Sequence, residues 1–243
     1  MNQDIYVLIE HLQGEIADIS YIMLAAARDL AESTGGQVVG VLLGHDAQGL
    51  ADDLAADQVF YADHPALKEF ASDAYLKTVA SLIQERTPRA ILFGNTTIGA
   101  DVASVLSARL SLSLVSSCVK ISEGKLISQI CGGKIMAESE LDENTTLVTM
   151  IPGGYKTEAG QSDAPPAIET FDAPALDDLR VTLKGYVEPE TGDVDISKEE
   201  ILVAIGRGIQ VEDNIELAEE LAEFLGGTIC ASRPIVDQGW LPV

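Results

Sequence analysis

Two short turns near the end of this 243-residue sequence combine glycine and arginine in a way that suits an anionic ligand. The first is Gly206-Arg207-Gly208, and the second is Ser232-Arg233-Pro234. Glycine lets a backbone approach a ligand closely, and arginine offers a planar fork of donors that fits phosphate. Each turn alone is equally typical of a tight connection carrying a solvated arginine. Both follow predicted strands of one unit, so we expect them to face one crevice, and this convergence favours a dinucleotide site.

A third turn, from Gly94 to Asp101, brings small residues and hydroxyls to the start of a predicted helix. Backbone N–H groups at such a start can hold an anion. The alternative is structural, with Thr96 or Thr97 capping the helix and the glycines allowing tight packing. We favour this structural interpretation.

Other kinds of chemistry find no support. The sequence contains no GxSxG, HExxH or Walker A motif, and no GxGxxG follows its first strand. The three histidines have no triad or metal-ligand spacing, so we predict surface positions for His11, His45 and His64. The three cysteines form no CxxC pair, and we predict buried thiols in a reducing compartment for Cys118, Cys131 and Cys230. We therefore predict no catalytic residue and no metal site.

The net negative charge of the chain argues against two classes of partner, nucleic acid and anionic lipid. A formal net charge of −24 opposes binding to nucleic acid and to anionic lipid, and the acid spread along the chain is typical of a solvated surface. No run of 18 apolar residues and no signal peptide is visible. We expect a cytoplasmic protein without membrane insertion.

Strands and helices alternate through the first half of the chain. Short apolar runs predict strands at 5–9, 38–43, 58–61, 90–93 and 114–121. Helical spacing predicts helices at 20–33, with Ser20 as cap, at 65–86 and at 97–112, and a weaker one at 49–55. This order predicts an α/β fold with a mainly parallel sheet and helices on both faces.

The pattern then changes. Strands at 125–131, 134–140 and 146–151 predict a β-meander added to the sheet, and 152–180 is expected to be an extended connection. One more strand is expected within 180–189. A βαβ unit follows, with strands at 201–205 and 228–231 around a helix at 213–225. We expect an N-terminal domain over 1–194, including the connection, and the incomplete start of a second domain over 195–243.

Two stretches together resemble the start of the FAD domain in electron transfer flavoprotein alpha subunits. They are Ile205-Gly206-Arg207-Gly208-Ile209 with Asp213-Asn214, and Ala231-Ser232-Arg233-Pro234 continuing to Trp240. Upstream, the order of Ile91–Asn95, Gly99–Asp101, Cys131–Lys134 and Ile151–Tyr155 is similar to that family's N-terminal domain, which is like adenine nucleotide alpha hydrolase domains.

This resemblance implies an electron carrier, not a bond-making enzyme. It implies FAD on this subunit, a beta subunit that holds AMP, and an acyl-CoA dehydrogenase or similar redox partner. Arg207 and Gly208 would approach the FAD pyrophosphate, while Ser232 and Arg233 would contact the flavin end. A full alpha subunit continues well beyond Val243, so we expect a fragment that does not retain FAD by itself.

Two other interpretations stay open. One is a free-standing adenine-nucleotide-binding or scaffold domain without redox activity, which would use the turn from Gly94 to Asp101. The other is a purely structural partner of a beta subunit. Nucleotide binding distinguishes the first, and co-purification with a beta-like subunit distinguishes the second.

Overall fold

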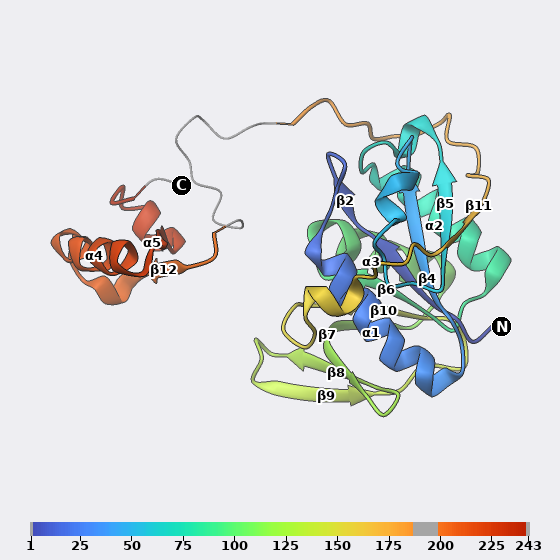
Figure 1. The fold of residues 1–243 in the computed structure, drawn as a ribbon, viewed down its shortest axis with the longest axis horizontal. Coiled ribbons are helices and arrows are strands. Elements are labelled where there is room, and N and C mark those ends of the chain that lie inside the picture. Colours follow the sequence, from blue (N-terminus) through green and yellow to red (C-terminus); the bar gives the residue numbers. More distant parts are fainter. Residues whose placement is uncertain (1, 187–198, 242–243) are drawn as a thin grey trace. The chain divides into compact units, whose positions relative to one another are not determined.

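The computed structural model describes residues 2–186 and 199–241. The chain divides into two compact units, Met1–Leu183 and Lys184–Val243, and each is described by itself. Helices and strands of the two units are labelled in Figure 1. Within the described residues, no helix is both long and apolar enough to cross a membrane.

A nine-stranded sheet forms the centre of the first unit, in the order β11-β5-β4-β1-β6-β10-β7-β8-β9. The strands are β1 (Ile5–Ile9), β4 (Val38–Gly44), β5 (Gln58–Asp63), β6 (Ala90–Gly94), β7 (Leu114–Ser122), β8 (Lys125–Ile130), β9 (Ile135–Ser139), β10 (Thr146–Met150) and β11 (Ala167–Thr170). Every pair from β11 to β7 is parallel, while the β7–β8 and β8–β9 pairs are antiparallel.

Helices cover both faces of this sheet (Figure 1). Alternate residues of β1 show how: Ile5 and Ile9 pack into the cluster that contains α1 (Asp18–Thr34). Tyr6 and Leu8 pack into the opposite cluster, with α2 (Ser72–Arg86) and α3 (Thr97–Leu110). Side chains of a strand point alternately to its two faces, so a uniformly apolar run requires cover on both sides. The predicted α/β class is confirmed.

Three predicted helices differ in detail. Helix α1 begins at Asp18, and Ser20 lies inside it, where its buried hydroxyl bonds to the Glu10 backbone instead of capping. The single helix predicted over 65–86 is a 3-10 helix at Pro65–Leu67 followed by α2. The weaker helix predicted at 49–55 is a 3-10 helix at Gln48–Ala51.

The predicted β-meander is wrong in one member. Strands β7, β8 and β9 form it, while β10 lies between β6 and β7 and runs parallel to both. Residues 146–150 are buried throughout, as an internal strand with packing on both faces requires. The short turns in the sequence suggested that residues 146–150 form a hairpin with the preceding strand. Because these residues are buried on both faces, they pair inside the sheet with β6 and β7 instead.

The segment expected as an extended connection over 152–180 carries β11, which the sequence did not predict. Its residues pair in parallel with β5 at the edge of the sheet. Downstream, Leu176 is buried and the Arg180 side chain donates to both carboxylate oxygens of Asp73. The strand expected within 180–189 is not found over 180–186, and the rest of that range lies outside the described residues.

The second unit contains the predicted βαβ arrangement. Strands β12 (Leu202–Ile205) and β13 (Thr228–Ala231) are parallel neighbours joined through α4 (Ile215–Leu225). Gly226 is the C-cap of α4, and its φ of 67° is a left-handed conformation that glycine adopts without strain. Ile205, Ile215, Ala218 and Ile235 form its small buried cluster.

The cysteines and histidines only partly follow their predicted positions. Cys118 is buried and Cys230 half-buried, but Cys131 is exposed at the turn after β8. His11 is buried, contrary to the surface position expected for it. Its ring nitrogen Nε2 lies 2.7 Å from the carbonyl oxygen of Leu43, so burial leaves this polar atom bonded.

Candidate functional site

The first candidate turn begins where β12 ends. Gly206 has an extended backbone, and a 3-10 helix follows at Arg207–Ile209. The Asn214 amide donates to the carbonyl oxygen of Ile209 at 2.8 Å and closes the connection toward α4. Arg207 and Gly208 are exposed, and no atom lies within 4 Å of the position a Gly208 Cβ would take. The backbone of this turn is therefore open to a ligand.

The second candidate turn begins where β13 ends. Ser232 precedes the short helix α5 (Arg233–Val236), with Pro234 in its first turn. Ile235 is buried in the unit's core and anchors the helix, while Ser232 and Arg233 are exposed. Arg233 Nε lies 3.6 Å from an Asp237 oxygen. Because both side chains are mostly in solvent, this ion pair is weak and leaves the guanidinium able to reorient.

The structure brings these two turns together. The Ser232 N–H donates to the carbonyl oxygen of Ile205 at 2.9 Å, continuing the β12–β13 pairing into the turns. A Cβ on Gly206 would lie 3.3 Å from Ser232 Oγ. The turns are neighbours at the carboxyl ends of parallel strands, which is where open α/β sheets bind ligands.

The positive charges of residues 199–243 lie on the same two turns. Arg207 and Arg233 are the only basic residues in the sequence from 199 to 243, a stretch otherwise rich in acid. Both lie on the paired turns, beside the Ser232 hydroxyl and the Gly208 backbone. Two guanidinium groups, a hydroxyl and an accessible backbone form a donor set suited to a pyrophosphate.

The turn from Gly94 to Asp101 is closed in the structure. Thr96 is the N-cap of α3, and its Oγ1 accepts from the Gly99 N–H at 3.0 Å and donates to Glu10 Oε2 at 2.8 Å. The buried Glu10 carboxylate thus lies at the N-terminus of α3, where a bound anion would lie. This geometry supports the structural interpretation of the turn.

Glu10 was not singled out from the sequence. It follows β1 directly and is only 3% exposed, and burial raises the pKa of its carboxyl group while the Thr96 hydrogen bond opposes that shift. Its Oε1 has no hydrogen-bond partner among the described residues. The sequence did place a carboxylate directly after a predicted buried strand. Burying a carboxylate costs free energy unless another group pairs with it, so this position could have been singled out.

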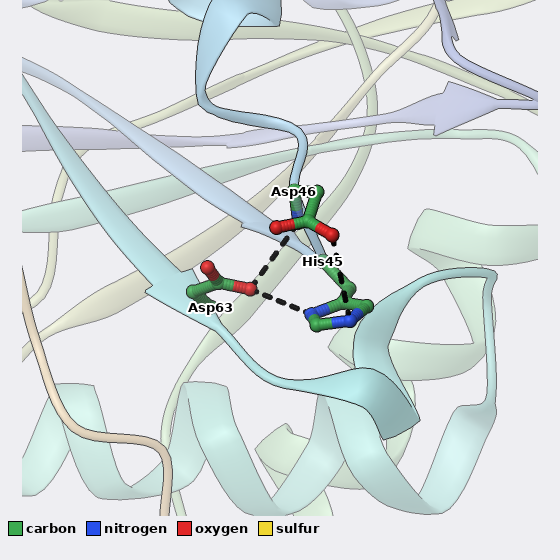
Figure 2. A group of neighbouring side chains, drawn as sticks. All are labelled: His45, Asp46 and Asp63. Atoms are coloured by element: carbon green, nitrogen blue, oxygen red, sulfur yellow. Dashed lines mark hydrogen bonds and ion pairs between the residues drawn. The ribbon is translucent and has the colours of Figure 1, made fainter.

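A second group of polar side chains lies at the ends of β4 and β5. His45 Nδ1 lies 2.9 Å from Asp63 Oδ1, and His45 Nε2 lies 3.7 Å from Asp46 Oδ2 (Figure 2). Spacing along the chain did not predict this group, because Asp63 is 18 positions from His45. The parallel pairing of Gly44 with Asp63 brings them together.

Two family models match most of the chain. Residues 5–176 match the electron transfer flavoprotein domain, and residues 195–243 match the electron transfer flavoprotein FAD-binding domain. The second match contains both candidate turns of the second unit.

Curated relatives agree with these models. The chain is 32% identical over 249 residues to the electron transfer flavoprotein subunit alpha of Thermoanaerobacterium thermosaccharolyticum, covering 98% of this chain and 76% of the relative. It is 31% identical to the corresponding subunit of Bacillus subtilis, with 98% and 74% covered. It is 29% identical to an acryloyl-CoA reductase electron transfer subunit beta of Anaerotignum propionicum, with 99% and 76% covered.

The relatives are therefore matched over nearly all of this chain and about three quarters of their own length. The matches run in order through both units and include the paired turns that carry Arg207 and Arg233. This chain belongs to the electron transfer flavoprotein alpha-subunit family, an FAD-binding family of electron carriers.

Proposed function

We propose that the paired turns of the second unit form part of an FAD site through which this subunit carries electrons. The observation that carries the proposal is the convergence of Arg207 and Arg233 on adjacent turns at the ends of β12 and β13. Arg207 and the Gly208 backbone bind the FAD pyrophosphate, and Ser232 and Arg233 contact the flavin end. Bound FAD supplies the ability to accept electrons and pass them on.

The charge of Arg233 gives this residue a role beyond binding. A fixed cation beside a flavin favours the negatively charged reduced form and thereby raises the reduction potential. Arginine suits this position because it stays charged and can stack on a planar ring. Its weak contact with Asp237 leaves it available to do so.

The partner in this proposal is a beta subunit of the same family, which holds any AMP of the complex. The closed turn from Gly94 to Asp101 supports that division, since the Glu10 carboxylate takes the anion position of α3 in this chain. Electrons come from an acyl-CoA dehydrogenase or a similar flavin enzyme, consistent with the relative named for acryloyl-CoA reductase. Free cysteines support a reducing, cytoplasmic location.

The chain alone is expected to be colourless after purification. The second unit has a small core, and all four proposed contact residues are exposed, so this unit by itself leaves the flavin largely in water. Stoichiometric flavin absorbance in the purified single chain would contradict this expectation.

The test compares variants of the chain in complex with a family beta subunit. Arg207→Ala removes a charge-assisted contact with the pyrophosphate and should weaken FAD binding about 10- to 100-fold, since such hydrogen bonds contribute about 1.5–3 kcal/mol. Arg233→Ala should lower the flavin reduction potential. Flavin fluorescence during titration measures the first effect, and spectroelectrochemistry measures the second.

Arg109→Ala is the matched control. Arg109 is an exposed arginine at the end of α3 in the first unit, so its loss should change neither quantity. Unchanged FAD affinity in Arg207→Ala, together with an unchanged potential in Arg233→Ala, would refute the assignment of these turns.

A further inference from the structure

The group formed by His45, Asp46 and Asp63 lies beside a cavity in the first unit, whereas the residues of the proposed flavin site belong to the second unit. The cavity has a volume of about 580 Å³, and its lining includes Gln13, His45, Asp46, Gly49, Lys68 and Glu69. It lies past the carboxyl ends of β4 and β5, the edge at which α/β sheets bind ligands. The proposed flavin contacts include none of these residues.

The hydrogen bond between His45 and Asp63 fixes which ring nitrogen is free. An aspartate side chain ionises near pH 3.9, so at neutral pH the Asp63 carboxylate can only accept a hydrogen bond. His45 Nδ1, 2.9 Å from Asp63 Oδ1, must therefore donate. In the neutral imidazole the lone pair then lies on Nε2, which is the atom that faces Asp46 (Figure 2).

The backbone holds both carboxylates in this arrangement. The Asp46 N–H also donates to Asp63 Oδ1, at 3.3 Å, and the next N–H, of Ala47, donates to the Tyr61 hydroxyl at 2.9 Å. Asp46 has a φ of 53°, a left-handed conformation that aspartate tolerates better than most residues. The turn after β4 thus turns the Asp46 side chain toward the histidine ring.

We propose that His45 Nε2 and Asp46 Oδ2 bind a divalent transition-metal ion, with Asp63 holding the ring from its other nitrogen. The two ligand atoms are 3.7 Å apart, a separation that one ion can bridge with bonds of about 2.0–2.2 Å. Imidazole with carboxylate suits zinc, nickel or copper better than magnesium or calcium. The adjoining cavity leaves room for water to complete the coordination.

Asp63 acts here as a positioning residue. A carboxylate that accepts from the second nitrogen of a metal-binding histidine fixes the ring and raises its basicity, and its loss usually costs 10- to 100-fold in metal affinity. His45 is half-buried, whereas Asp46 and Asp63 are exposed. An ion bound here would be open to solvent and able to exchange with it.

The experiment titrates ZnCl2 into the untagged chain of residues 1–243 by calorimetry. The Cys131→Ser/Cys230→Ser background is used because both thiols contact solvent and would bind zinc themselves. One equivalent should bind, and His45→Gln or Asp46→Ala should lower the affinity at least about tenfold. Asp63→Ala should cost about 10- to 100-fold, and Asp63→Asn should recover part of it because its amide oxygen still accepts from Nδ1.

His64→Asn is the matched control. His64 is one residue from Asp63 and caps the 3-10 helix at Pro65–Leu67, a role that asparagine fills equally well. The zinc affinity of His64→Asn should equal that of the parent. Nitrogen NMR of the His45 ring supplies a second readout: Asp63→Ala should shift the proton away from Nδ1. No saturable binding in the parent, or equal binding by His45→Gln, would overturn the proposal.

Discussion

Gly99 tests how tightly the N-terminus of α3 is packed against the end of β6. A Cβ at position 99 would lie 2.2 Å from the carbonyl oxygen of Gly94 and 2.7 Å from Glu10 Oε1. The first contact is with backbone inside the central sheet, so it cannot be relieved by a rotamer change. Gly99→Ala must therefore move the helix away from the strand.

The expected cost follows from these contacts. Overpacking of this kind destabilises proteins by about 1–3 kcal/mol. Replacing glycine by alanine within a helix returns about 0.5–1 kcal/mol through the unfolded state. The net loss is then up to about 2.5 kcal/mol, which for a unit of this size lowers the melting temperature by up to about 10 °C.

Thermal unfolding of the full chain, followed by circular dichroism, measures this loss. Gly49→Ala is the control, because no atom lies within 4 Å of its Cβ position. It receives the gain from the unfolded state without the clash, so its melting temperature should equal or slightly exceed that of the parent. Adding Glu10→Ala to Gly99→Ala should not restore stability, since the harder contact is with the Gly94 backbone. Equal melting temperatures for Gly99→Ala and Gly49→Ala would refute the packing described for this turn.

Three further predictions concern the first unit. Burial raises the pKa of the Glu10 carboxyl group above its usual value of 4.5. The stability that this group contributes is therefore complete below pH 4.5 and is lost as the pH rises. The melting temperature of Glu10→Gln relative to the parent should increase from about pH 4 to about pH 8, and a constant difference would contradict this. Hydrogen bonds from Arg180 lower the pKa of Asp73 to about 2, so Arg180→Ala should release residues 176–183 and speed limited proteolysis there at pH 7, with the two chains converging as pH falls toward 2. Millimolar AMP should leave the melting temperature of the chain unchanged, because Glu10 fills the anion position of α3; a concentration-dependent rise would show that the turn binds nucleotide.

Local pattern was enough to predict most elements of this fold. Uniformly apolar runs such as 5–9 and 90–93 require cover on both faces, so they indicate a parallel sheet without any knowledge of its order. The turns at Arg207 and Ser232 were predictable for the same reason. Each follows a strand directly, and the carboxyl ends of neighbouring parallel strands meet at one edge.

The pairing of two strands was predicted wrongly from the sequence. The position of β10 between β6 and β7, and that of β11 beside β5, depend on which apolar surfaces remain to be covered after distant segments have packed. Short turns before Thr146 suggested a hairpin, and the Gly- and Pro-rich composition around Ala167 suggested an extended connection. Local composition does not show which strand will cover a given apolar surface of the sheet.

The sequence by itself determined the family, the α/β class and the residues of the cationic turns, because these depend on short-range order along the chain. Only the tertiary structure decided what meets across the sheet. It placed Glu10 against Thr96, 86 positions away, and joined His45 to Asp63 through the β4–β5 register. Parallel strands are joined by long crossovers, so the partners of a side chain at their ends are set by packing and not by spacing in the sequence.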